Sequence, residues 1–211
     1  MRKAVFLLVA TFVFLVLAQS VQVSADDYEL VLEDFKLVDA DGKEQTFKAL
    51  KGEKGTVVIF LSVQCPVVKG YNERINQIFN EYKSKGIAFI GINSNSTESP
   101  EQIGSHARET YGFPVLIDKG NVLADELNAS VTPEVFLFDS NGKLIYKGAI
   151  DNDRSGKNIT ENYLRDALDG LLMKKAIAKA STKAFGCTIK RTEEKVKPET
   201  TSITIRRTKV S

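Results

Sequence analysis

One short apolar run restricts the fold of this chain more than any other segment. Residues 56–62 read Thr-Val-Val-Ile-Phe-Leu-Ser, rich in β-branched side chains and without the polar alternation of a half-exposed strand. Such a run is typical of a strand covered on both faces, as in a parallel sheet between helices. Helical spacing of apolar residues follows at 71–82, and a second apolar strand is predicted at 87–92. Strand, helix and strand in this order form a right-handed crossover unit, so we expect an α/β fold.

The remaining elements fit one domain, which we place at residues 26–191. Turn signals at 39–42 and 141–142 predict an N-terminal hairpin and a second hairpin later in the chain. The strands are expected at 31–38, 44–50, 113–117, 134–138 and 143–148, and the further helices at 100–112, 121–128 and 161–173. Residues 192–211 are rich in Thr, Lys and Arg, and we expect a flexible basic tail with a weak strand candidate at 202–206.

The first 25 residues carry the pattern of a secretory signal peptide. Arg2 and Lys3 precede an apolar run at 4–17, and the segment ends in Val23-Ser24-Ala25, small residues of the kind that a signal peptidase reads. The apolar run is short against the roughly 20 residues that span a bilayer, so membrane contact is expected only if the leader stays uncleaved. We therefore predict an exported protein, periplasmic or secreted, in a compartment that permits disulfides.

Composition narrows the chemistry that is open to the mature chain. Without the leader, basic and acidic residues balance, and a neutral domain lacks the basic excess that nucleic-acid binding needs. Two cysteines and a single histidine, His106, are too few for a zinc or copper site, and we expect His106 to be a solvated helix residue. Residues 151–156 imitate the start of a calcium loop, but Asn162 stands where a bidentate carboxylate belongs. No metal and no cofactor is expected.

Cys65 is the residue with the strongest signal for chemistry. It lies between the apolar strand at 56–62 and a helix, with Pro66 at a position that tolerates a missing N–H. The partial positive charge of a helix N-terminus favours the thiolate, which is the nucleophilic form of cysteine. A buried structural cysteine is the alternative interpretation.

An apolar strand that ends in Cys65-Pro66, then a helix, a βα insertion and Thr132-Pro133 before a hairpin resembles the thioredoxin superfamily. The segments Gln64-Cys-Pro-Val-Val-Lys69 and Gly186-Cys-Thr-Ile-Lys190 resemble more closely the exported redoxins of the alkyl hydroperoxide reductase and thiol-specific antioxidant group. The resemblance covers about residues 35–191. It implies a thioredoxin-like fold, that is, a central mixed sheet flanked by helices, with an N-terminal hairpin and a βα insertion. It also implies a redox-active Cys65 and a cis Pro133 beside it.

Two departures from the family pattern shape the expected mechanism. Thioredoxin-type reductases carry a second cysteine three residues after the first, whereas Val68 occupies that place here. Peroxiredoxins place Thr or Ser three residues before the reactive cysteine, which Ser62 matches, but Val58 stands where they have a proline. The closing motif of the family falls on Cys187, which makes it the candidate resolving thiol, and Phe185 and Ile189 could anchor its segment.

The sequence therefore predicts an exported thiol-based oxidoreductase in which Cys65 attacks a disulfide or a peroxide. Cys187 or an external thiol reductant regenerates it. Ser62, Gln64 and Thr132 are expected to supply polar contacts around the sulfur. The expected partners are protein thiols and disulfides or small peroxides. The alternative is a non-catalytic thioredoxin-like binding module, with a permanent Cys65–Cys187 disulfide and a groove beside Pro133 for an extended peptide.

Overall fold

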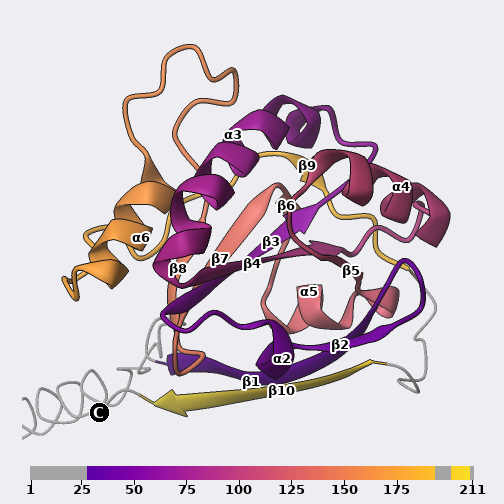
Figure 1. Cartoon of the computed structure of the whole chain (residues 1–211), viewed down its shortest axis with the longest axis horizontal. Coiled ribbons are helices and arrows are strands. Elements are labelled where there is room, and N and C mark those ends of the chain that lie inside the picture. Colours follow the sequence, from indigo (N-terminus) through magenta and orange to yellow (C-terminus); the bar gives the residue numbers. More distant parts are fainter. Residues whose placement is uncertain (1–27, 193–200, 210–211) are drawn as a thin grey trace, which may run out of the picture.

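The structure is a computed structural model that describes residues 28–192 and 201–209 (Figure 1). The predicted signal peptide at 1–25 lies outside these described residues. Within them, every helix is too short or too polar to cross a membrane.

A mixed sheet forms the centre of the molecule, with the strand order β10-β1-β5-β4-β3-β7-β8. β3 runs parallel to β4 and antiparallel to β7, and β4 runs parallel to β5, so the mixed sheet that was predicted is confirmed. Its strands are β1 (Tyr28–Asp39), β3 (Gly55–Leu61), β4 (Ile87–Asn93), β5 (Val115–Ile117), β7 (Glu134–Asp139), β8 (Leu144–Gly148) and β10 (Ser202–Lys209), and β2 (Glu44–Thr46) pairs with β1.

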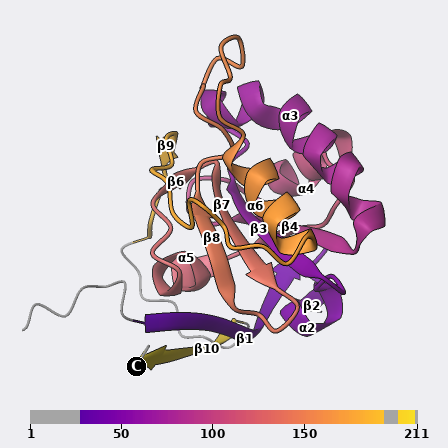
Figure 2. The same ribbon diagram turned by 90° about the vertical axis from the view of Figure 1, so that its left-hand side faces the viewer.

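Helices cover both faces of this sheet (Figure 2). All residues of β3 are buried, because alternate side chains enter two different cores. Val57 and Ile59 pack on the side of the longer helices, whereas Val58 and Phe60 pack on the opposite side, with β1. The first side carries α3 (Pro66–Tyr82), α4 (Pro100–Thr110) and α6 (Tyr163–Leu172), and the second carries α2 (Phe47–Leu50) and α5 (Val122–Glu126). Two apolar environments explain why the strand lacks polar alternation.

The second strand of the N-terminal hairpin is shorter than predicted. We expected a strand at 44–50, but β2 ends at Thr46, whose hydroxyl accepts a hydrogen bond from Ala49 N at 3.2 Å. That hydrogen bond caps α2, and Phe47 is buried in the core beneath it. Capping and burial of one aromatic side chain thus replace the extended conformation.

The prediction of a flexible tail is wrong for residues 202–209. They form β10, which pairs antiparallel with β1 from Tyr28↔Lys209 to Lys36↔Ser202. Ile203 and Ile205 are half-buried against the second core, and this apolar contact offsets the entropy lost when the strand is ordered. The weak strand candidate at 202–206 lies within β10, while residues 193–200 and 210–211 lie outside the described part of the chain.

Candidate active site

Cys65 occupies the junction between the central strand and the longest helix. It follows the end of β3 and is the N-cap residue of α3, with Pro66 in the first turn. Its side chain is 2% exposed. The sulfur therefore lies at the positive end of a helix of 17 residues, in a site from which bulk water is excluded.

A two-residue strand pair brings Cys187 to this sulfur. β6 (Val131–Thr132) and β9 (Cys187–Thr188) pair antiparallel, with Thr132 opposite Cys187, and they lie side by side in Figure 2. Cys65 and Cys187 form a disulfide with a Cα–Cα distance of 5.9 Å across a sequence separation of 122 residues. Gly186 permits this approach, since a Cβ atom there would overlap the carbonyl oxygen of Thr132.

The segment that carries Cys187 is held on both sides of the cysteine. The predicted anchors are confirmed: Phe185 packs against the first core, with its ring 6.3 Å from that of Tyr71, and Ile189 is buried in the second core. Ile189 N donates to Ser130 O at 3.0 Å, and Lys190 N donates to the side chain of Asn95 at 3.0 Å. The cysteine is thus ordered by contacts that do not include the disulfide.

The peptide bond between Thr132 and Pro133 is cis, as the resemblance implies. The carbonyl oxygen of Thr132 lies 3.3 Å from the sulfur of Cys65. The backbone that leads into Pro133 therefore borders Cys65 directly.

The three polar residues that were predicted around the sulfur use other atoms than expected, or do not contact it. Ser62 lies beside Cys65, but its hydroxyl accepts from Cys65 N at 3.1 Å. Thr132 contacts the sulfur through its backbone, while its hydroxyl donates to Cys187 O at 3.5 Å. Gln64 is exposed, and its side-chain amide donates to Thr97 O at 3.5 Å rather than to either sulfur. Ser62 and Thr132 therefore order the backbone around the cysteines.

Glu98 is the main residue of the site that the sequence did not reveal. It lies between β4 and α4 and is 8% exposed. One carboxylate oxygen accepts from Ser62 Oγ at 2.5 Å and from Gln64 N at 2.9 Å. The other accepts from Val63 N at 2.9 Å and from Asn93 Nδ2 at 2.6 Å. One sequence feature could have pointed to Glu98: it lies in a polar segment that follows the strand next to the one that leads to Cys65. The ends of neighbouring parallel strands meet at one edge of a sheet.

A second buried glutamate supports the opposite wall. Glu134, 7% exposed, accepts from Ser130 N at 2.8 Å and from Val131 N at 3.3 Å. These donors belong to the segment that leads into Pro133. Each of the two backbone segments at the disulfide is thus held by its own carboxylate.

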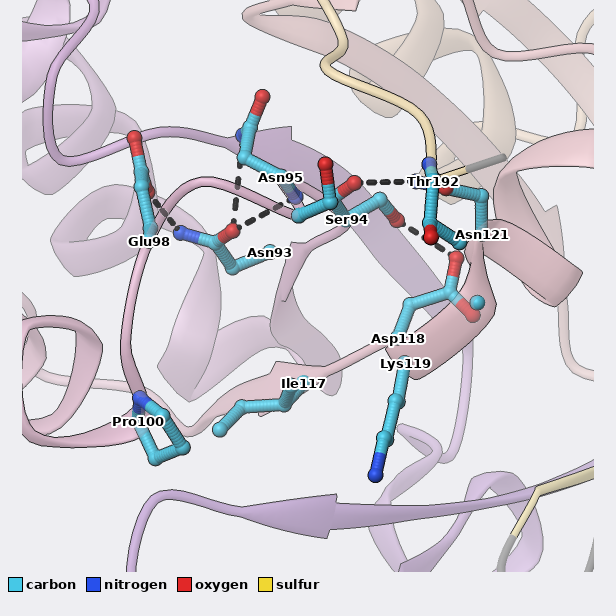
Figure 3. Close-up of a pocket in the computed structure, with 12 residues that line it drawn as sticks. Asn93, Ser94, Asn95, Glu98, Pro100, Ile117, Asp118, Lys119, Asn121 and Thr192 are labelled. Carbon is cyan, nitrogen blue, oxygen red and sulfur yellow. Dashed lines mark hydrogen bonds between the residues drawn. The ribbon is translucent and has the colours of Figure 1, made fainter. Parts of the chain in front are cut away.

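A pocket of about 380 Å³ lies beside the loop of Glu98 (Figure 3). Asp118 on its wall accepts from Ser94 Oγ at 2.6 Å and from two backbone N–H groups at the start of α5, and burial raises the pKa of Asp118. Asn93 and Asn95 on the opposite wall are hydrogen-bonded to each other and to Glu98 and Lys190. The side chains of Asp118, Asn93 and Asn95 are therefore hydrogen-bonded to the loops that form the pocket.

The segment at 151–156 is tied to α3 and not arranged as a calcium loop. Asp151 accepts from Tyr71 OH at 2.7 Å and pairs with Arg74 at 2.6 Å, and burial together with Asp151 raises the pKa of Tyr71. In the described residues, groups of three or more His, Cys, Asp or Glu that could hold a metal ion do not occur.

His106 is not the solvated helix residue that was expected. Its Nδ1 lies 3.2 Å from Thr110 Oγ1, and its Nε2 is buried without a hydrogen-bond partner. The ring borders a small cavity that Ser62 and Asn93 also line, and burial lowers the pKa of His106.

A family model and named relatives match more than half of this chain. Residues 28–168 match the family model described as Redoxin. Thiol-disulfide oxidoreductase ResA of Bacillus cereus (strain ZK / E33L) is 30% identical over 115 residues, which are 54% of this chain and 65% of that protein. The chain thus spans less than two thirds of the length of this relative.

Solved structures extend the likeness to the whole domain. The crystal structure of a hypothetical protein from Sinorhizobium meliloti 1021 is 33% identical, with a TM-score of 0.72 over 78% of this chain and 94% of that chain. The exposed lipoprotein thioredoxin of Streptococcus pneumoniae strain TIGR4 shares the fold, with 18% identity and a TM-score of 0.51 over 64% of this chain and 98% of that one. Because the family model matches most of this chain, the chain is a member of the Redoxin family with a thioredoxin-like fold.

Proposed function

We propose that this protein is a thiol–disulfide oxidoreductase whose redox pair is Cys65 and Cys187. The observation that carries the proposal is the disulfide between them, formed at the N-terminus of α3 and against the carbonyl oxygen of Thr132. The name of the relative ResA describes the same reaction class. Val68, which is fully buried, stands in the position where thioredoxin-type reductases have their second cysteine. The two cysteines of the redox pair therefore come from distant parts of the chain and not from one helical turn.

In the proposed cycle, the reduced protein transfers two electrons to a disulfide of another protein. Once the docked segment of Cys187 has moved aside in the reduced protein, the Cys65 thiolate attacks one substrate sulfur, and the other substrate sulfur leaves as a thiolate. The Cys187 thiolate then attacks Cys65 Sγ, which releases the first substrate sulfur and forms the Cys65–Cys187 disulfide. Two thiols of the substrate and one disulfide of this protein result, so atoms and electrons balance.

Regeneration begins at Cys187 in this proposal. Cys65 is 2% exposed, whereas Cys187 is half-buried on a two-residue strand. An external thiol therefore meets Cys187 first, forms a mixed disulfide with it and releases Cys65 as a thiolate at the helix N-terminus. A second thiol then reduces the mixed disulfide on Cys187.

Export belongs to the same proposal. The leader pattern at 1–25 supports it, and an oxidising compartment would maintain the disulfide that the structure contains.

Reduction of insulin disulfides tests the activity. The full chain, its Cys65→Ser variant and its Cys187→Ser variant are compared with dithiothreitol as electron donor. We expect turnover by the wild type alone, and a mixed disulfide trapped on Cys65 in the Cys187→Ser variant. Hydrogen peroxide consumption without insulin reduction would assign peroxide as the substrate instead.

The well-anchored segment around Cys187 favours one competing function, the non-catalytic binding module with a permanent disulfide. Equilibration of the folded wild type with glutathione buffers separates the two. Reversible opening of the disulfide in the folded state supports the oxidoreductase. A disulfide that opens only when the protein unfolds supports the binding module.

A further inference from the structure

Both carboxylate oxygens of Glu98 are engaged in hydrogen bonds. They accept four donors: Ser62 Oγ, Val63 N, Gln64 N and Asn93 Nδ2. Among the ion pairs between described residues, none includes Glu98.

Glu98 also occupies two backbone donors of the loop that ends in Cys65. Val63 N and Gln64 N both point to its carboxylate, and Cys65 N donates to Ser62 Oγ. Pro66 has no N–H. Four successive residues therefore offer no backbone donor to a thiolate at Cys65, and only later N–H groups of α3 remain.

A buried carboxylate that is hydrogen-bonded to the loop of a forming thiolate opposes thiolate formation, because the two negative charges repel each other. We propose that Glu98 is a positioning residue that raises the pKa of the Cys65 thiol and makes the Cys65–Cys187 disulfide harder to reduce. At a pH where the Cys65 thiolate forms, the reduced protein is then a stronger reductant than it would be without Glu98, and its natural partners are protein disulfides that accept electrons from it. This direction of electron flow rests on the proposed thiol–disulfide exchange.

The other titratable groups that face this loop do not cancel the effect. His106 from α4 borders the small cavity behind Ser62, and burial lowers its pKa, which favours the neutral imidazole. Lys69 is exposed, one turn into α3, where water screens its charge. Glu134, behind the segment that leads into Pro133, adds a second negative charge on the opposite wall. Glu98 alone contacts the backbone of the Cys65 loop.

The test measures the pKa of Cys65 from iodoacetamide alkylation rates against pH in a Cys187→Ser background. With Glu98 present, we expect a pKa at or above the ordinary thiol value of about 8.5, despite the helix N-terminus. Glu98→Gln should lower this pKa by about one unit. In the otherwise wild-type chain, Glu98→Gln should raise the equilibrium constant for reduction by glutathione about tenfold, equivalent to ~30 mV, at a pH above the Cys65 pKa of both proteins, and by less than about twofold at pH 7. Glu98→Asp keeps the charge and should restore most of both values.

Asp118→Asn is the matched control, because Asp118 is a buried carboxylate of the same pocket that does not contact residues 62–65 (Figure 3). It should leave the pKa of Cys65 unchanged. A merely structural role for Glu98 would loosen the loop and shift the pKa of Glu98→Gln upward or not at all, which overturns the inference. If Glu98→Gln does not fold, a pKa below about 7 with Glu98 present overturns it equally. Failure of the proposed function appears separately, as a wild-type disulfide that glutathione does not open reversibly.

Discussion

The two halves of the disulfide are built in different ways. Cys65 sits where the fully buried β3 passes into α3, and Ser62 and Glu98 hydrogen-bond the backbone of its loop. Cys187 sits on a two-residue strand opposite Thr132, and the two residues after the strand bind Ser130 and Asn95, so its contacts come from distant parts of the chain. The nucleophile therefore belongs to the framework of the fold, whereas its partner is docked onto it. A docked segment can leave and return during a redox cycle.

Breaking the covalent link between the two regions should have the largest effect on the free energy of unfolding. Reduction of the disulfide, which closes a loop of 122 residues, should lower the free energy of unfolding by about 4 to 5 kcal/mol. Urea unfolding with and without dithiothreitol measures it. The double variant Cys65→Ser/Cys187→Ser is the control and should not respond to dithiothreitol. An equal stability of the oxidised and reduced protein would show that docking alone holds the two regions together.

Gly186→Ala should disrupt the docking of the segment that carries Cys187 without affecting the loop of Cys65. The new Cβ atom overlaps the carbonyl oxygen of Thr132, so β9 must move away from β6, at a cost of about 2 kcal/mol. We expect a smaller fraction of disulfide at a given glutathione ratio, measured by mass spectrometry after thiol alkylation. The matched control is Thr188→Ala, at an exposed position of the same strand, which should change stability by less than about 0.5 kcal/mol. Equal effects of both variants would contradict the close approach.

Ser62→Ala should destabilise the loop of Cys65 without affecting the segment that carries Cys187. It removes the acceptor of Cys65 N and one donor to Glu98, both buried, and should cost about 1 to 2 kcal/mol in urea unfolding. Because α3 and β3 hold the loop independently, the pairing of β6 and β9 should persist. Hydrogen exchange at Ile189 N, which bonds to Ser130 O, reports on that pairing. Loss of protection there would mean that the two halves are not separate units.

The smallest effect is expected in the exposed loop that follows Asp151. Backbone N–H groups of Asn158 and Ser155 lower the pKa of Asp153 to about 2, from an ordinary value of 3.8. Because the folded-state pKa lies below the unfolded one, the contribution to stability is present above about pH 4 and is lost as the pH falls through 2. Carboxyl NMR titration should show this value. The disulfide and both of its loops should remain unchanged over that range, and a coupled change at Cys187 would contradict the separation of regions.

Local patterns in the chain determined the framework half of this site. Missing polar alternation predicted that β3 is buried on both faces, helical spacing predicted α3, and the Cys65-Pro66 pair marked the start of that helix. The resemblance added the cis bond before Pro133 and pointed to Cys187. These features depend on near neighbours in sequence or on motifs, so they could be predicted without the tertiary structure.

Only the tertiary structure decided what depends on distant partners. Glu98 reaches the Cys65 loop because β4 pairs in register with β3, and a single glutamate in a polar loop gives no sign of that contact. Residues 202–209 form β10 rather than a flexible tail because β1 offers them a free edge and a shared apolar face. Segments this far apart interact through backbone pairing and burial, whose geometry is fixed by the assembled sheet and not by residue pattern.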